Sequence, residues 1–347
     1  MRALRLTAWQ QAAEVEDVAD PEPGPGEVLV RIGGAGACHS DLHLMHEFPP
    51  GLLPFDAPFT LGHENAGWVE TVGAGVTGLE PGQPVAVYGA WGCGFCNRCL
   101  QGMDNYCENR SRPEFKCEGG GLGSDGGMAP LLLVPTARHV VPLDALDPVD
   151  AAPLTDAGLT PYHAVKRSLP RLVPGSTAVV IGAGGLGHMA IQILAAISAT
   201  RVVAVDQSPE ALDLARSVGA DHTVLAGDTA TAEIRDLTGG QGTDLVLDFV
   251  GADATIALAV SVARPLSDVT VVGIGGGSYP FSFFTVPYEV SFATTYWGSL
   301  SELREVLALA EAGKVRAHVE RFSLDDAPKA YTRMAEGTLR GRAVIVP

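Results

Sequence analysis

Short apolar runs alternate with amphipathic segments between residues 177 and 275. The runs TAVVI, ending at residue 181, and RVVAVD, ending at residue 206, are rich in β-branched residues and are short enough for buried strands. Segments between the runs repeat their apolar residues at helical spacing. Helices are expected at 209–220 and 254–263, and further strands at 243–251 and 269–275. This alternation predicts an α/β fold with a doubly wound parallel sheet.

One uncharged stretch, Ser176–Ser198, is long enough to cross a bilayer. Four glycines interrupt its middle, and a β-rich run precedes them. A buried strand, a glycine turn and a helix explain the stretch better than a membrane span does.

The glycine turn has the spacing GxGxxG, which lets a backbone approach a pyrophosphate at a helix N-terminus. Asp206 ends the next predicted strand, nineteen residues after Gly187, where a carboxylate can bind the adenosine ribose and repel a 2′-phosphate. The pattern therefore predicts NAD as the coenzyme. The expected coenzyme-binding residues of this region are Gly182, Gly184, Gly185, Leu186, Gly187 and Asp206.

Four of the six cysteines fall within fifteen residues, as Cys93, Cys96, Cys99 and Cys107. Two-residue gaps let thiolates from a tight loop converge on one ion, and a closed four-cysteine set is typical of structural zinc. An iron–sulfur cluster is the competing use of four thiolates. Zinc is favoured because no other redox apparatus lies nearby. Cys117 lies outside this spacing and is expected to be a free thiol.

The composition narrows the class of protein. The 347 residues suffice for two domains, and the net charge of −17 argues against binding to nucleic acid or to an anionic membrane surface. The N-terminal residues lack the pattern of a secretion signal. We therefore expect a cytoplasmic protein with reduced thiols.

A second group of metal-ligating residue types is dispersed along the chain. Cys38, His63 and Asp156 make a mixed set of three donors, which with water as the fourth ligand is typical of catalytic zinc. Each residue alone is weak evidence, because a lone cysteine is usually a small buried hydrophobe. Sequence spacing does not show that these three side chains meet.

Together, the segment GHENAGWVETVGAGVTGLEPGQPV, the cysteine cluster and the glycine turn resemble the zinc-containing alcohol dehydrogenases of the medium-chain dehydrogenase/reductase superfamily. The resemblance covers essentially the whole chain and points to bacterial enzymes that act on secondary alcohols. It implies a GroES-like, β-rich catalytic domain at 1–157 and 299–347, with a zinc lobe at 93–107, and a Rossmann coenzyme domain at 158–298. It also implies that Cys38, His63 and Asp156 converge on one zinc, although many members have Cys in place of Asp156.

Further roles carry over from this resemblance one position at a time. Ser40 matches the hydroxyl that takes the substrate proton, His43 the outer end of the proton relay, and Glu64 a glutamate beside the zinc. Coenzyme contacts are implied for His39, where the family often has Arg, for Thr160 near the nicotinamide and for Arg340 near the pyrophosphate. Tyr296 and Trp297 could floor an apolar substrate pocket at the domain joint, or could simply pack at that joint.

The resemblance implies reversible oxidation of alcohols to ketones or aldehydes, with NAD and two zinc ions per chain, by a homo-oligomer, either a dimer or a tetramer. Apolar or aromatic secondary alcohols are favoured by the apolar segment FPPGLLPFDAPF. The alternatives are a polyol or amino-alcohol dehydrogenase, a zinc-free quinone or enoyl reductase of the same fold, and a nucleotide-sensing protein that has kept the fold.

Overall fold

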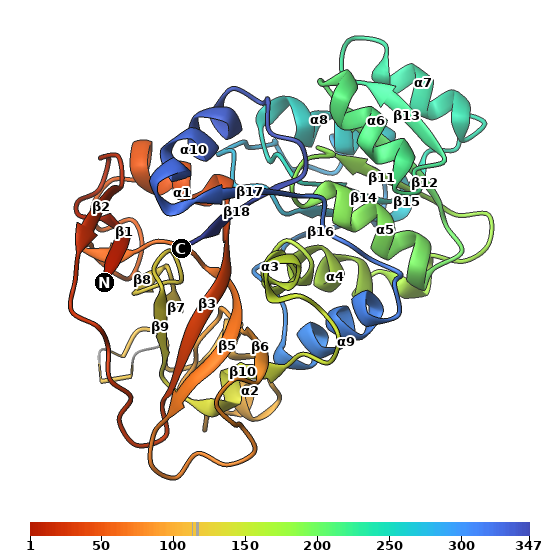
Figure 1. Cartoon of the computed structure of the whole chain (residues 1–347). Helices are drawn as coiled ribbons and strands as arrows, with labels where there is room; N and C mark the ends of the chain where they lie inside the picture. Colours follow the sequence, from red (N-terminus) through yellow and green to blue (C-terminus); the bar gives the residue numbers. More distant parts are fainter. Residues whose placement is uncertain (113, 116–117) are drawn as a thin grey trace. The chain divides into compact units, whose positions relative to one another are not determined.

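The computed structural model describes residues 1–112, 114–115 and 118–347 (Figure 1). By its internal contacts the chain divides into two compact units. The first consists of Met1–Leu159, Trp297–Glu311 and Ala317–Pro347, and the second of Thr160–Tyr296 and Ala312–Arg316.

The second unit contains a six-stranded parallel sheet of order β13-β12-β11-β14-β15-β16. Its strands are β11 Thr177–Ile181, β12 Arg201–Asp206, β13 His222–Leu225, β14 Thr243–Asp248, β15 Ala263–Val271 and β16 Ser291–Thr294. The strand order runs outward from β11 to β13, then reverses and runs from β14 to β16. The predicted doubly wound parallel sheet is confirmed.

The helices of this unit follow from the same connectivity. They are α4 Leu159–Lys166, α5 Gly187–Ile197, α6 Pro209–Ser217, α7 Ala230–Leu237 and α8 Asp253–Val262. Because right-handed crossovers in opposite directions leave helices on opposite faces, α5 and α6 lie on one face of the sheet and α7 and α8 on the other.

One strand begins earlier than its hydrophobic pattern predicts. β15 starts at Ala263, whereas the apolar run starts at residue 269. Pro265 and Leu266 lie between residues 263 and 269, and Leu266 has a left-handed φ of 68°. The register between β15 and β14 is shifted at this point. An irregular strand start does not alternate regularly, so the sequence pattern misses it.

The uncharged stretch at 176–198 folds as the sequence predicts, into β11, the glycine turn and α5. Within the described part of the chain, none of the helices combines the length and the apolar character that crossing a membrane requires.

The first unit is β-rich. Its largest sheet has the order β10-β6-β5-β3-β18-β17, and β9 also pairs with β3. The strands of this sheet are β3 Val28–Ala37, β5 Glu64–Val72, β6 Pro84–Val87, β9 Leu131–Val134, β10 Val140–Pro142, β17 Val319–Ser323 and β18 Arg342–Val346. The shorter strands are β1 Arg2–Leu6, β2 Glu14–Asp17, β4 Phe59–Thr60, β7 Gly119–Gly120 and β8 Gly123–Ser124. The helices are α1 His39–His46, α2 Asn97–Leu100, α3 Pro148–Ala151, α9 Leu300–Glu311 and α10 Ala327–Ala335.

Register within this sheet positions the chemistry-bearing residues. β3 runs antiparallel to β5 with Gly36 opposite Glu64, and antiparallel to β18 with Ala37 opposite Ala343. The end of β3, the start of β5 and the start of β18 therefore meet at one place. A buried apolar core that includes Leu4, Val30 and Phe59 supports this part of the sheet.

Candidate active site and structural metal centre

Three potential metal ligands meet at this junction of strands. Cys38 follows β3, His63 precedes β5, and Asp156 follows the short 3₁₀ helix Ala152–Thr155. Their sulfur, nitrogen and oxygen donor atoms all lie within 4.8 Å of one another, and all three residues are buried. Nε2 of His63 lies 3.6 Å from Oδ2 of Asp156. The predicted convergence is thus present in the structure.

A buried chain of polar groups lies behind His63. Oδ1 of Asp41 lies 3.4 Å from Nδ1 of His63, on the side of the ring away from the cluster. Oδ2 of Asp41 accepts hydrogen bonds from the Cys38 backbone N–H at 2.9 Å and from the Tyr331 hydroxyl at 2.8 Å. Since a carboxylate beside the second ring nitrogen fixes the orientation of a ligating imidazole, Asp41 points Nε2 of His63 toward the cluster.

A second buried carboxylate is held by a guanidinium. Arg342 donates from Nε to Oε2 of Glu64 at 2.9 Å and from Nη2 to Oε1 at 2.6 Å. The Ala157 backbone N–H donates to Oε1 of Glu64 at 2.9 Å. The carboxylate occupies the space above Gly36, where a Cβ would lie 1.8 Å from Oε2. Nη2 of Arg342 also lies 4.0 Å from Oδ2 of Asp156.

These charges determine the protonation of the ligands. Burial raises the pKa of the Cys38 thiol, but the positive charges of Arg342 and His63 outweigh burial and lower it. Burial lowers the pKa of His63, whereas the carboxylates of Asp41 and Asp156 raise it well above its ordinary value. The site therefore favours the thiolate form of Cys38 and a positive charge at His63. Both properties suit a divalent metal ion, which would replace the proton on the imidazole.

The donor set also fits zinc in its chemistry. One thiolate, one imidazole and one carboxylate provide three ligands and leave a fourth position for an exchangeable oxygen ligand. Cys38, His63 and Asp156 would hold the ion. Glu64 is already paired with Arg342 at both of its oxygens, so in this structure it lies beside the set.

The residues expected to handle protons lie on α1 directly after Cys38. Oγ of Ser40 lies 3.5 Å from Nε2 of His63, at the edge of the cluster. Nδ1 of His43 lies 2.6 Å from the carboxylate of Glu47, which is largely exposed. The His39 ring lies 5.6 Å from that of His43.

The four clustered cysteines form a separate centre in the first unit. Their sulfur atoms lie within 4.8 Å of one another, with 3.9 Å between Cys93 and Cys99 and 4.0 Å between Cys96 and Cys107. A tetrahedron with metal–sulfur bonds of about 2.3 Å has edges of about 3.8 Å, whereas a disulfide bond is about 2.05 Å long. The spacing fits a four-thiolate metal centre. Cys117 lies outside the described residues.

Backbone N–H groups of the lobe point at the sulfur atoms. The N–H of Cys96 donates to Cys93 at 3.4 Å, and that of Cys99 to Cys96 at 3.5 Å. Burial raises the pKa of Cys93, but the N–H of Phe95 and the amide of Asn109 lower it to about 6. Burial raises the pKa of Cys99, and the neighbouring sulfurs add to the increase. Four thiolates therefore coexist here only around a cation.

The glycine turn lies in the second unit. Gly182 has a φ of 84°, and a Cβ at Gly187 would lie 1.8 Å from the Gly182 carbonyl oxygen, so both positions require glycine. Oδ2 of Asp206 accepts from the Ala183 N–H at 2.7 Å, which places the carboxylate beside the turn. Gly184 is exposed, with nothing near its α-carbon that would obstruct a ligand. This geometry fits a dinucleotide whose ribose faces Asp206.

The remaining predicted residues occupy varied positions. Thr160 lies buried in α4, and Tyr296 ends the main segment of the second unit. Trp297 is buried in the first unit, 6.1 Å from the His63 ring. Arg340 is exposed, and its backbone N–H donates to Glu320 at 2.8 Å.

Sequence reasoning missed Asp41, Tyr331 and Arg342. Asp41 and Arg342 had a detectable signal. Asp41 is a charged residue three positions after the predicted ligand Cys38, and Arg342 is a charged residue that begins the strand-forming run RAVIV. Tyr331 had none, because a tyrosine on an amphipathic helix is ordinary.

Comparison with known proteins places these sites in a family. The model described as "Alcohol dehydrogenase GroES-like domain" matches residues 24–145, and the model described as "Zinc-binding dehydrogenase" matches residues 185–312. The chain is 36% identical to a D-arabinose 1-dehydrogenase (NADP(+)) of Saccharolobus solfataricus, covering 100% of this chain and 97% of that protein. It is also 36% identical to an NAD-dependent alcohol dehydrogenase of Sulfurisphaera tokodaii, covering both in full.

A crystal structure of the alcohol dehydrogenase from Aeropyrum pernix superimposes with a TM-score of 0.92 at 38% identity, covering 100% of both chains. The β-rich unit with its two cysteine-containing clusters and the doubly wound unit thus correspond to the GroES-like and coenzyme-binding parts expected from the sequence. The relatives match from end to end at more than 30% identity. The chain belongs to the zinc-binding alcohol dehydrogenases.

Proposed function

We propose that this alcohol dehydrogenase oxidises apolar or aromatic secondary alcohols reversibly to ketones with NAD, using one zinc ion at Cys38, His63 and Asp156. The observation that carries this proposal is the convergence of those three buried donors beside the hydroxyl of Ser40. When bound, zinc would lower the pKa of a hydroxyl and polarise a carbonyl, and NAD would accept hydride.

The residues around the donors provide the remaining chemistry. The hydroxyl of Ser40 lies at the edge of the cluster and would accept the substrate proton. His43 would form the outer end of this relay and, through its contact with Glu47, release the proton to solvent. The Glu64–Arg342 pair balances charge behind the site, since the Arg342 guanidinium lies near both Glu64 and Asp156.

The preference for NAD rests on Asp206. Its carboxylate, held by the N–H groups of Ala183 and Ser208, would accept both ribose hydroxyls and would repel a 2′-phosphate. The main coenzyme contacts would come from the glycine turn at 182–187. His39, Thr160 and Arg340 remain proposed coenzyme contacts.

An apolar substrate is supported by Trp297, whose buried ring stands edge-on to His63 at an interplanar angle of 70°. The alternative is a polyol or amino-alcohol substrate, which one observation favours: the relative from Saccharolobus solfataricus is named for D-arabinose. The role of Tyr296 in the pocket remains part of the proposal.

The deciding experiment is a panel of secondary, primary, sugar and amino alcohols followed by NADH absorbance, with zinc quantified in the same preparation. We expect two zinc ions per chain, the highest kcat/KM for apolar secondary alcohols, and a higher kcat/KM with NAD than with NADP. A zinc-free but fully active protein would point to a quinone or enoyl reductase. Two zinc ions without turnover of any alcohol would favour a sensor.

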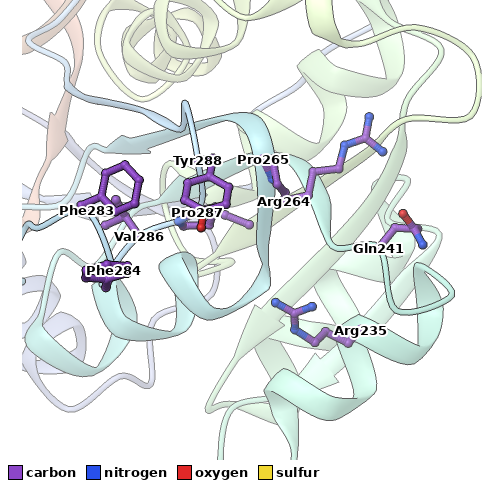
Figure 2. Close-up of a pocket in the computed structure, with 10 residues that line it drawn as sticks. Arg235, Gln241, Arg264, Pro265, Phe283, Phe284, Val286, Pro287 and Tyr288 are labelled. Carbon is purple, nitrogen blue, oxygen red and sulfur yellow. The ribbon is translucent and has the colours of Figure 1, made fainter.

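A homo-oligomer is supported by an exposed aromatic surface on the second unit. Phe283, Phe284 and Tyr288 are 70%, 89% and 61% exposed, and they cluster beside a depression of about 320 Å³ that Arg264 also lines (Figure 2). The surface lies near β16, which in the described sheet pairs only with β15. Large exposed apolar patches are typical of interfaces. Sedimentation should show a dimer or tetramer that Phe284→Glu shifts toward monomer.

A cytoplasmic location is also proposed. It is supported by the two clusters of cysteine-containing metal donors, since thiolate ligands are kept available in a reducing compartment.

A further inference from the structure

We propose that the four-cysteine lobe, residues 93–107, positions Trp297 against His63, so that the lobe supports the substrate pocket and does not merely stabilise the fold. This inference rests on the proposed assignment of Cys38, His63 and Asp156 as the catalytic metal site. All of the contacts that carry it lie within the first unit.

Trp297 has a backbone conformation that is unfavourable for a bulky residue. Its φ is 51°, in the left-handed region that bulky residues rarely adopt, yet only 4% of the residue is exposed. Such a conformation persists only where surrounding structure holds it. The ring centre lies 6.1 Å from that of His63, in an edge-to-face arrangement.

Two glycines form the slot that receives the ring. A Cβ at Gly89 would lie 2.8 Å from Cζ2 of Trp297, and one at Gly119 would lie 2.8 Å from Cη2. The strand-like bridge between Ala90 and Gly119 keeps the two sides of the slot together. The segment carrying Gly89 continues directly into Cys93, the first ligand of the lobe.

The backbone after Trp297 is fastened to the lobe. The Tyr88 hydroxyl, fully buried, donates to the Gly298 carbonyl at 2.6 Å. The N–H of Leu300, the first residue of α9, donates at 2.8 Å to the carbonyl of Gly102, which lies between the ligands Cys99 and Cys107. Tyr88 therefore holds the segment on one side of Ser299, and the lobe holds it on the other.

The contacts of Tyr88 also lead back to the lobe. Its ring lies 5.9 Å from that of His139, and its N–H donates to the His139 carbonyl at 2.8 Å. Buried Asp104, within the lobe, lies 3.1 Å from Nε2 of His139 and is paired with Arg138. Arg138 in turn donates to the Cys99 carbonyl at 3.0 Å. The Gly102 carbonyl belongs to the four-cysteine loop, and Tyr88 is connected to the same loop through His139 and Asp104.

The test uses the full-length zinc-loaded enzyme labelled with 5-fluorotryptophan. The chain has four tryptophans, so ¹⁹F NMR gives four signals, and Trp297→Phe assigns the relevant one. Tyr88→Phe removes the hydrogen bond to Gly298 and keeps the ring. We expect the Trp297 signal to shift or broaden, and KM for a secondary alcohol to rise about threefold to tenfold with kcat changed less than about twofold.

The matched control is Tyr279→Phe, which removes a hydroxyl that donates to the Thr285 carbonyl at 3.1 Å in the second unit. It should leave the Trp297 signal and KM unchanged. A second variant, Cys107→Ser, releases the lobe ion and should move the Trp297 signal while the other metal site stays filled.

An unmoved Trp297 signal in both Tyr88→Phe and Cys107→Ser would overturn the inference. So would an unchanged KM in Tyr88→Phe. The NMR readout requires no turnover, so it reports on this inference even if no alcohol is oxidised, and that outcome would instead refute the proposed function.

Discussion

The four sulfur atoms of the lobe come from fifteen consecutive residues, whereas the potential donors of the Cys38 cluster come from three distant parts of the chain. In the lobe, N–H groups of the same short loop stabilise the thiolates. At the Cys38 cluster, that task falls to the positive charges of Arg342 and His63, which come from distant parts of the chain. The first centre can form as one local unit, while the second depends on the register of the whole sheet.

The largest effect should follow removal of a donor from the open cluster. Cys38→Ala should lower kcat/KM by on the order of 10³-fold or more, because the metal contributes several kcal/mol to the reaction. Zinc should fall from two ions to one, and the thermal midpoint should change little. Steady-state kinetics measure the loss of kcat/KM, and elemental analysis measures the zinc content. Retention of two zinc ions would remove Cys38 from the ligand set.

The converse variant is Cys107→Ser. Loss of the closed centre should cost about 3 kcal/mol, and for a chain of 347 residues that corresponds to a fall of roughly 4 °C in the thermal midpoint. Calorimetry measures the midpoint, and elemental analysis should again find one zinc. If Cys38→Ala destabilised the protein more than Cys107→Ser, the distinction between the two centres would be wrong.

In zinc-stripped protein, the thiols of the two centres should react with an alkylating reagent with different pH dependence. The pKa of Cys93 is about 6, so its thiolate fraction falls as the pH drops through 6, and at pH 7 it should exceed that of an ordinary thiol about 30-fold. Iodoacetamide should therefore modify Cys93 with a midpoint near pH 6. Cys38 is buried and should react slowly at every pH. Peptide mass spectrometry measures both, and a Cys93 midpoint above pH 8 would contradict the local stabilisation.

The smallest effect should come from Tyr331→Phe, which removes the hydroxyl that donates to Asp41. Because the tyrosine acts through Asp41 on His63, a chelator should extract the catalytic zinc about tenfold faster at most, and the lobe zinc should be unaffected. Tyr279→Phe is again the matched control. If the chelator extracted zinc equally fast from both variants, Tyr331 would have no role in orienting His63.

The contrast between the centres also explains what the sequence predicts well. Cys93 to Cys107 and the glycine turn at 182–187 are local, so their spacing predicts a four-thiolate metal centre and, together with Asp206, a dinucleotide site. The alternation of strands and helices likewise predicts the doubly wound sheet, except where Pro265 and the left-handed Leu266 disturb the start of β15.

The rest depends on contacts between distant residues. The meeting of Cys38, His63 and Asp156 follows from antiparallel register, which the spacing of single residues does not encode, and only the family resemblance suggested it. Tyr331 lies 290 positions from Asp41 in the sequence, and its role depends on where α10 packs.

Gly36 has a consequence for how this chain can evolve. The Glu64 carboxylate occupies the space that any side chain at position 36 would need, at 1.8 Å from its Cβ. A lineage that replaced Gly36 would therefore first have to lose Glu64, and Arg342 would then remain buried without its bidentate partner. The order in which mutations could be accepted is restricted, so these three positions should change together or remain fixed together across descendants of this sequence.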